Sequence, residues 1–454
     1  MASWKNWSEE TRHDGIKVYE PTTEQQLIDA VNDARDNHLK VRVVGSGHAW
    51  SNIGLRKNSE DAGNASPPAA DPGAVSPGYR GGAVILTHGL KRILAVDRDA
   101  ARKTVKIEAG AVLAEASEKL YDEYRLTFPT MGDTDRQTVA GAISTDTHGS
   151  GAKLRSLADY VTGIEMVLAD GTCRALDDRE LKAARVSLGM LGAIYSVTFQ
   201  VTNTIYLNHH RTLVRVPDDF DNLDAHFHNN RHVEYWYFPY TDHADLMLRE
   251  TTHPTNPGIY LIETEQLRAE GRFLDFLGRV RPSALPWAFK NGTKGRRDEH
   301  RVGPAHTILP LVSQSTVDDV KTHTMEYLFP YEKLREAFEQ LQLSITAARD
   351  DGIYVGIPVH IRFIKQSRNS LLSPYVWPLT ASFSVNFSTK HEGFEQWFRD
   401  VERRMLDPSI GGRPHLGKIH FKKPDIPAEF EEIRKELDPG EMFWSPEDIY
   451  REIP

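Results

Sequence analysis

The sequence predicts an α+β protein of two domains, and three observations lead to that prediction. The chain has 454 residues, 39% of them hydrophobic and 26% charged, which is too long for one ordinary core and typical of a globular protein. Its first part alternates a helical pattern with short β-branched runs. After Phe199 the chain changes to longer strands rich in tyrosine, phenylalanine and histidine, interleaved with helical segments. This pattern indicates a large antiparallel sheet covered on one face by helices.

The first elements are a capped helix and several short strands. Thr22 or Thr23 is the expected N-cap of an amphipathic helix that begins EQQLIDAV, and a glutamine in its first turn can close a capping box. The run at 41–44 predicts a strand, and VILTHGL, ILAVDRD and KTVKIEAG predict three more. Residues 59–82 are crowded with proline, glycine, alanine and serine. We expect a surface insertion there, with a lid over the active site as the alternative.

The second half predicts long strands and long helices. HVEYWYFPY (232–240) and HTMEYLFPY (323–331) have the composition of strands, and the segments 332–351 and 392–406 have helical spacing. In the first of these strands the period of two places Tyr235 and Tyr237 on one face and Trp236 and Phe238 on the other. One of the two faces is expected to shape a pocket.

Charge and composition exclude several functional classes. The net charge of -9 and the lack of a long basic run argue against a nucleic-acid partner. No stretch of about 18 apolar residues exists, and the N-terminus lacks the apolar core of a secretory signal. Cys173 is the single cysteine, so no internal disulfide can form. We therefore expect a soluble cytoplasmic protein.

Two glycine-rich segments carry the functional signal. VRVVGSGHAWS (41–51) is typical of a strand that enters a tight loop and presses backbone amides against a phosphate-bearing cofactor. In the second, GDTDRQTVAGAISTDTHGSGAK (132–153), small residues and hydroxyls alternate without a helical apolar stripe. Backbone N–H groups and the hydroxyls of Ser144, Thr145 and Thr147 are available there to an extended polar ligand. Glycines that only form turns are the alternative.

These two segments resemble the flavin-binding half of the vanillyl-alcohol-oxidase superfamily, and within it the aldonolactone oxidase and alditol oxidase family. The resemblance implies a two-subdomain FAD-binding domain at 1–203, an α+β substrate-binding cap with a large antiparallel sheet at 204–412, and a segment at 413–454 that returns to the FAD domain. Further segments that carry the resemblance are SLGMLGAIYSVTF (187–199), EYWYFPYTDHADLML (234–248), MEYLFPYEKLREAF (325–338), HIRFIKQSRNSLLSPYV (360–376) and RPHLGKIH (413–420).

The resemblance places a histidine that binds the flavin covalently, through its 8α-methyl carbon, at His48. Such a bond raises the reduction potential of the flavin, which suits oxidation of an unactivated alcohol. A histidine that only caps the loop is the alternative. Other residues that the resemblance implies at the cofactor are Gly45, Ser46, Gly47, Ala49, Trp50, Ser51, Gly132, Asp133, Gly141, Ser144, Thr145, Thr147, His148, Gly149, Gly151, Gly192, Ile194 and His420.

Gly132 and Asp133 stand where the family approaches the flavin face and the substrate. A glycine at this position goes with oxidases in the family, whereas alanine goes with dehydrogenases that exclude oxygen. Related alditol oxidases have serine where this chain has Asp133, near the substrate hydroxyl, so the carboxylate is a departure from the pattern.

The substrate side of the family pattern is Glu-x-Arg on a strand, and here it is His360-Ile361-Arg362. The arginine can hydrogen-bond the substrate oxygen, while a histidine in place of glutamate can act as a general base. Lys418 corresponds to a lysine that approaches the reacting hydroxyl, with a surface ion pair as the alternative. Ser384 aligns with a substrate contact.

The resemblance implies an enzyme that oxidises a polyol, sugar lactone or related polar alcohol, with FAD as cofactor and dioxygen as acceptor. The catalytic residues would be His360, Arg362 and Lys418, and the substrate contacts Asp133 and Ser384. Alternatives are a dehydrogenase of the same fold and a flavin-binding module without sugar turnover. No metal is expected, because no carboxylate or cysteine completes plausible ligand spacing with His415 and His420.

Overall fold

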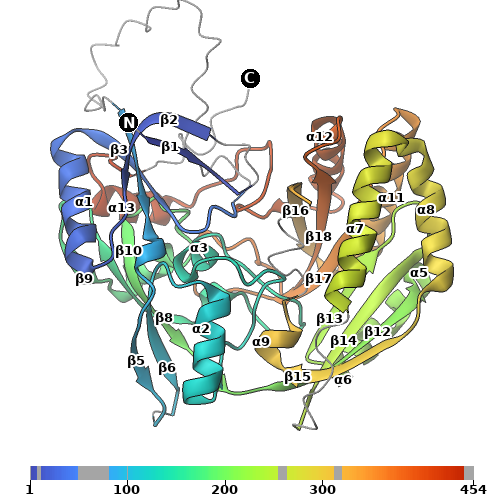
Figure 1. Ribbon diagram of the computed structural model, residues 1–454, viewed down its shortest axis with the longest axis horizontal. Coiled ribbons are helices and arrows are strands. Elements are labelled where there is room, and N and C mark those ends of the chain that lie inside the picture. The colour runs from blue at the N-terminus through green and yellow to red at the C-terminus, as the bar shows by residue number, and fades with distance from the viewer. Residues whose placement is uncertain are drawn as a thin grey trace, which may run out of the picture.

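The computed structural model describes residues 2–7, 12–49, 81–99, 101–253, 263–310 and 320–443. Figure 1 shows two halves side by side, with α1, α13 and β10 in one half and α7, α8, α11 and α12 in the other. The fold is α+β, as the sequence predicts, and its large sheet is antiparallel. Within the described residues, no helix is both long and apolar enough to cross a membrane.

The first half contains a small mixed sheet of order β1-β2-β4-β3, in which β4 lies parallel to both β2 and β3. The helix before β3 is capped as expected: the Thr23 side chain accepts from the Gln26 N–H, and the Gln26 side chain accepts from the Thr22 N–H. The bounds are β1 Ala2–Lys5, β2 Arg12–Tyr19, α1 Glu24–Asp36, β3 Leu39–Val44 and β4 Gly81–Leu86.

A second, antiparallel sheet of order β5-β6-β10-β8-β9 packs against the same half, with α2, α3 and α4 around it. The short strands β7 and β11 pair with each other. The bounds are β5 Ile93–Asp97, β6 Thr104–Glu108, α2 Leu113–Lys119, β7 Leu126–Thr127, α3 Val139–Ser144, β8 Val161–Val167, β9 Cys173–Ala175, α4 Asp178–Ala184, β10 Ala193–Gln200 and β11 Thr202–Asn203.

The second half is built on an eight-stranded antiparallel sheet of order β15-β12-β14-β13-β17-β18-β16-β19. The strands and helices predicted at 232–240, 323–331, 332–351 and 392–406 are all present. The bounds are β12 Tyr206–Arg215, α5 Val216–Asp219, α6 Leu223–Asn229, β13 His232–Tyr237, β14 His243–Thr252, α7 Glu263–Val280, α8 Leu285–Gly292, β15 Glu299–Pro304, α9 Ala305–Ile308, β16 Thr322–Pro330, α11 Leu334–Asp350, β17 Val359–Lys365, β18 Leu379–Ser388, α12 Phe394–Met405 and β19 Arg413–Pro414.

One face of this sheet forms an apolar core with α6, α11 and α12. The period of two explains which side chains enter it: Met325, Tyr327 and Phe329 of β16 are fully buried in this core. The alternate residues of the same strand, Thr324 and Glu326, face the other way, into a cavity. The binary pattern of these strands therefore assigns one face to the core and the other to a site.

The C-terminal part of the chain touches the first half again. Helix α13 (Ala428–Leu437) packs into the core of that half, and the Val41 N–H of β3 donates to the Met442 carbonyl at 2.8 Å. The predicted domain boundaries at residues 203 and 412 stay a prediction. Nearly all of the 59–82 segment lies outside the described residues; its last two residues begin β4.

Candidate active site

A cavity of about 460 Å³ lies on the polar face of the large sheet, against the glycine-rich segments of the first half. Sites that enclose drug-sized ligands measure roughly 300–1,000 Å³. The five residues predicted as catalytic residues or substrate contacts all line this cavity: Asp133, His360, Arg362, Ser384 and Lys418. In β17 the period of two points His360 and Arg362 into it, whereas Ile361 lies in the core beneath.

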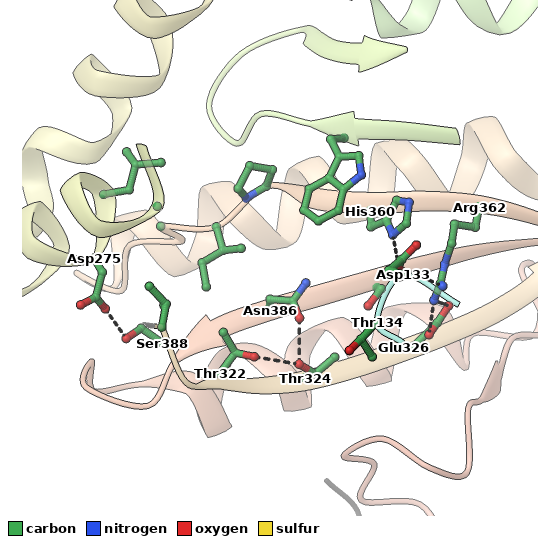
Figure 2. Close-up of a pocket in the computed structure, with 18 of the residues that line it drawn as sticks. Asp133, Thr134, Asp275, Thr322, Thr324, Glu326, His360, Arg362, Asn386 and Ser388 are labelled. Carbon is green, nitrogen blue, oxygen red and sulfur yellow. Dashed lines mark hydrogen bonds and ion pairs between the residues drawn. The ribbon is translucent and has the colours of Figure 1, made fainter. Parts of the chain in front are cut away.

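Arg362 is held by three groups in the cavity wall. Its Nη2 donates to both carboxylate oxygens of Glu326, at 2.7 and 2.8 Å, and its Nη1 donates to Asp133 and to the His148 carbonyl, each at 3.1 Å. Figure 2 shows Arg362 beside Asp133 and Glu326. The buried Nε–H of Arg362 has no partner among the described residues. The rigidly held guanidinium therefore fixes a positive charge at the cavity wall.

Two histidines lie close to Glu326: His148, and His415, whose backbone N–H donates to the Glu326 carbonyl. His148 Nδ1 donates to the Gly149 carbonyl at 2.8 Å, and its Nε2 lies 3.0 Å from Glu326, so a proton must sit between these two groups. The Gly417 N–H donates to Nδ1 of His415, which leaves the ring hydrogen of His415 on Nε2. Burial lowers the pKa of His415 to about 3, so this ring is neutral.

His360 lies between two carboxylates. Its Nδ1 is 2.9 Å from Asp133 and its Nε2 is 3.2 Å from Glu234, and the Trp236 ring stacks on it. Burial alone would lower the pKa of His360, but the two carboxylates outweigh it and raise the pKa. Each ring nitrogen thus lies within hydrogen-bonding distance of a carboxylate oxygen. These contacts support a positioning role for His360, and its expected role as general base stays a prediction.

The two carboxylates beside His360 are themselves ion-paired. Burial opposes their ionisation, but His360 and Arg362 hold the pKa of Asp133 below its usual range. The Arg249 guanidinium, 2.6 Å from Glu234, likewise outweighs burial and lowers the pKa of Glu234 to about 2. Asp133 is the shared member, because one of its oxygens contacts both His360 and Arg362.

Lys418 is the titratable amine of the cavity. Burial lowers the pKa of Lys418 from its ordinary value to about 8, and the neighbouring Arg362 acts in the same direction. Its backbone N–H donates to the His415 carbonyl, which ties it to the loop after β19. An amine with this pKa is partly neutral near physiological pH, so it can accept a proton.

A smaller cavity of about 110 Å³ adjoins the first, and His48, Gln137 and Thr145 line both. The Gly45 loop packs directly on α3, because a Cβ at Gly45 would lie 1.9 Å from the Thr138 hydroxyl. Predicted cofactor residues that line the smaller cavity are Gly45, Ser46, Gly47, His48, Ala49, Gly141, Ser144, Thr145, Gly192 and Ile194.

The remaining cofactor predictions divide into three groups. Gly132, Asp133, Thr147 and His148 line the larger cavity. Gly149, Gly151 and His420 line neither. Gly149 accepts from His148, the Gly151 N–H donates to the Phe363 carbonyl, and His420 Nδ1 contacts the Lys422 carbonyl, so each has a packing role in its loop. Trp50 and Ser51 lie outside the described residues.

Sequence reasoning missed Glu326, Glu234 and Arg42. Glu326 and Glu234 are acids inside otherwise apolar strands, a signal that could have marked them as buried partners of cations. Arg42 interrupts the β-branched run of β3; it is 2% exposed and lines the smaller cavity. A buried guanidinium beside a glycine loop suits a diphosphate.

Two groups of side chains within the described residues have the spacing of a metal site. They are His148, Glu326 and His415, and Asp133, Glu234 and His360. In both groups the carboxylates are paired with Arg362 or Arg249, so their charge is already matched. Ion pairing accounts for both groups, and the expectation of no metal stays a prediction.

The residues present fit an elongated ligand with a diphosphate and a planar ring. Glycines and Arg42 surround the smaller cavity, His48 stands where the two cavities adjoin, and Arg362 lines the larger one. This arrangement is that of an FAD-linked oxidoreductase. A profile of the FAD-binding domain matches residues 71–177, and the profile of D-arabinono-1,4-lactone oxidase matches residues 197–451, more than half of the chain. The protein belongs to this family of FAD-linked aldonolactone oxidases and dehydrogenases.

Among the relatives that align over nearly their whole length, some are named dehydrogenases and others oxidases. The chain is 30% identical to L-gulono-1,4-lactone dehydrogenase of Mycobacterium tuberculosis, over 97% of this chain and 96% of that protein. It is 25% identical to L-gulonolactone oxidase of Bos taurus, over the same shares. Among solved structures, a solvent-stable cholesterol oxidase superposes with a TM-score of 0.79 at 17% identity, over 98% of this chain and 96% of that one. The last likeness shows the shared fold.

Proposed function

We propose that this protein is an FAD-dependent oxidase that removes hydride from the carbon of an alcohol group and passes the electrons to dioxygen, which becomes hydrogen peroxide. The names of its relatives place aldonolactones among the first substrates to test. The observation that carries the proposal is the Arg362 guanidinium, fixed by Glu326 and Asp133 at the wall of the cavity that His48 also lines.

The chain offers distinct residues to the two ends of FAD. Arg42 and the backbone of the Gly45–Ala49 loop would hold the diphosphate, and His48 would bind the ring covalently. Stacking by Trp7 on His48, with ring centroids 5.4 Å apart, supports a fixed orientation of the imidazole. When bound, FAD supplies the hydride acceptor and the route to the second acceptor.

Two side chains would act on the substrate hydroxyl. The positive charge of the Arg362 guanidinium, which lines the cavity, would orient the alcohol oxygen and stabilise negative charge on it. Lys418, with its pKa lowered to about 8 by burial, can accept the hydroxyl proton at Nζ in its neutral form. We therefore assign the proton acceptor to Lys418. His360 is a positioning residue that fixes Asp133.

Gly132 supports an oxidase. It lines the larger cavity, and a Cβ at this position would lie 2.8 Å from the Thr147 methyl group. An alanine would therefore clash with Thr147 and force a shift in the cavity wall, beside the residues expected at the flavin, whereas glycine permits this close packing. The second candidate, a dehydrogenase with another acceptor, is favoured by the name of the Mycobacterium tuberculosis relative.

The test is anaerobic reduction followed by oxygen. The holoenzyme is mixed with aldonolactones, alditols and simple alcohols without oxygen, and flavin bleaching is recorded. Air or an artificial dye is then added. The proposal expects bleaching by an alcohol and fast reoxidation in air with one peroxide per turnover. Reoxidation by the dye alone would make the protein a dehydrogenase, and no bleaching by any alcohol would contradict both.

A further inference from the structure

The larger cavity extends well beyond the reacting groups, along one face of the large sheet. Figure 2 shows Asp275 and Ser388 at the opposite end from Arg362 and Glu326, with Asn386 and Thr324 between them. Thr324 and Glu326 alternate along β16, and Asn386 and Ser388 alternate along β18, so the floor of the cavity follows these two strands away from Arg362. A ligand whose reacting group lies beside Arg362 could therefore extend along this face of the sheet toward Asp275 and Ser388.

The polar side chains of this distal part are paired with one another. The Thr324 hydroxyl donates to Asn386 at 2.8 Å, and the Ser388 hydroxyl donates to Asp275 at 2.5 Å. At the wall, Arg296 is ion-paired with Asp245 at 2.6 Å. Since these groups already hydrogen-bond within the protein, they gain little from hydrogen bonds to the hydroxyls of a ligand.

A large part of the remaining lining is apolar. It comes from the end of β13, from β14, from the loop before β17, and from the inner sides of α7 and α8. Its members include Phe238, Met247, Phe273, Leu274, Phe289 and Ile357. Phe273 of α7 lines the cavity and is still 53% exposed, which places the mouth of the cavity at this helix.

We propose that this distal part is a binding site for a hydrocarbon or aromatic group, so that the preferred substrate is an alcohol with an extended apolar body. The proposal rests on the proposed function for the end that reacts. A polyol or sugar lactone in the same place would lose water from its hydroxyls against Phe289, Leu274 and Ile357 without gaining partners. An apolar body would instead bury its surface there.

The experiment measures binding and turnover separately. One set of probes is a series of straight-chain primary alcohols of increasing length, and the other is the methyl ethers of these alcohols, which lack the reacting hydroxyl. Ether binding is followed through the absorption spectrum of the bound flavin and through tryptophan fluorescence. Each added methylene is expected to tighten binding, and to raise kcat/KM of the alcohol, about three- to fourfold until the cavity is filled. L-Gulono-1,4-lactone is the polar comparison.

Two variants of the same helix give a matched control. Phe273 and Phe276 both belong to α7 and are 53% and 54% exposed, but only Phe273 lines the cavity. Phe273→Ser is expected to weaken binding of the longest ethers about tenfold and to leave short alcohols unchanged. Phe276→Ser is expected to change neither, because its side chain points elsewhere.

The outcomes separate this site from the proposed function. Chain-length-dependent ether binding that Phe273→Ser removes would support the apolar site even if no alcohol bleached the flavin. Binding that ignores chain length, equal effects of the two variants, or a lactone preferred over every apolar alcohol would overturn it. Turnover of the lactone without ether binding would leave the oxidase standing and remove the apolar site.

Discussion

Asp133 and His360 are two departures from the family pattern that contact each other. The first stands where related alditol oxidases have serine, and the second where the family has glutamate. The structure places them 2.9 Å apart, with Glu234 3.2 Å from the other ring nitrogen. The carboxylate of the family pattern is thus replaced on β17 by a histidine, and two carboxylates reach it from elsewhere, Asp133 from the loop before α3 and Glu234 from β13. We therefore expect the effects of the two residues on stability and activity to be coupled.

A double-mutant cycle tests this coupling. His360→Glu alone would place a third carboxylate beside Asp133 and Glu234, and Asp133→Ser alone would leave His360 and Arg362 short of an acceptor. We expect both single variants to lose thermal stability and kcat/KM, and the double variant to recover part of each. The coupling free energy should be about 0.5–3 kcal/mol. His360→Glu combined with Asp36→Ser on exposed α1 should be additive, and additivity at the Asp133 pair would refute the coupling.

Lys418 predicts the pH dependence of the reaction. Burial lowers its pKa to about 8, and only the neutral amine accepts a proton, so kcat/KM for an alcohol should rise as the pH increases through about 8. Lys418→Met should lower the rate about 100- to 10,000-fold and remove this step from the profile. Steady-state rates across pH 6–10 on the holoenzyme check it. A rate that falls over this range in the wild type would exclude Lys418 as the acceptor.

The loop after α3 is the element that joins the two halves. Its Gly151 N–H donates to Phe363 of β17 at 2.6 Å, and its His148 contacts Glu326 of β16. The sequence marks this loop because its small residues cannot form a core of their own. It does not reveal the partners, because His148 and Glu326 are 178 positions apart and their meeting depends on the register of β16 and β17.

Asp146 in this loop predicts a pH-dependent stability. Burial raises the pKa of Asp146 to about 7, although the Ser156 and Ser373 hydroxyls oppose this shift. The folded protein therefore holds a proton that the unfolded chain releases above about pH 4, and this stabilisation is lost as the pH rises from about 4 through 7. The loss amounts to about 4 kcal/mol.

In the variant Asp146→Asn, the free energy of unfolding should not show this decrease with rising pH. Asparagine tolerates the left-handed backbone found there, where φ is 57°. Urea unfolding of the holoenzyme at pH 5.5 and 8.5 should show a smaller decrease in the variant than in the wild type. Asp36→Asn, at an exposed carboxylate, should retain the wild-type decrease. Equal decreases in wild type and Asp146→Asn would show that Asp146 is already ionised at the lower pH.

The strands of the large sheet show what an element-level pattern can and cannot predict. Alternation along β13 and β16 correctly separates a core face from a cavity face, because the period of two is fixed by backbone geometry. It does not predict which strands are neighbours. The pairing of β13 with β17 and of β16 with β18 is what brings Trp236, His360 and Glu326 around one cavity.

At the scale of the whole molecule, the proposed function depends on two adjoining cavities, one between the glycine loops and one on the large sheet. The glycine loops around the smaller cavity could be predicted from sequence because their signal is local, and the covalent role of His48 stays a prediction. The ion pairs around Arg362 could be predicted only in part. Arg362 and Asp133 lie 229 positions apart, and tertiary packing decides which carboxylate pairs with which cation. The 30% identity to a dehydrogenase leaves the electron acceptor to experiment.

Gly132→Ala tests how oxygen enters. The added methyl group would lie 2.8 Å from the Thr147 methyl, closer than van der Waals contact, so the cavity wall at Thr147 would have to shift. We expect slower reoxidation of the reduced holoenzyme by dioxygen, with anaerobic reduction by substrate and reoxidation by a dye little changed. Stopped-flow traces of both half-reactions measure this. A variant that reacts with oxygen as fast as the wild type would remove Gly132 from the argument for an oxidase.

The central claim is that both cavities form one FAD site with His48 at their junction. The most direct measurement is acid denaturation of the purified holoenzyme and of His48→Ala, followed by mass analysis of the protein and its peptides. We predict that flavin stays with the wild-type protein, on the peptide that contains His48, and leaves the variant. Flavin released from both proteins would contradict the covalent bond, and wild-type protein purified without any flavin would contradict the site itself.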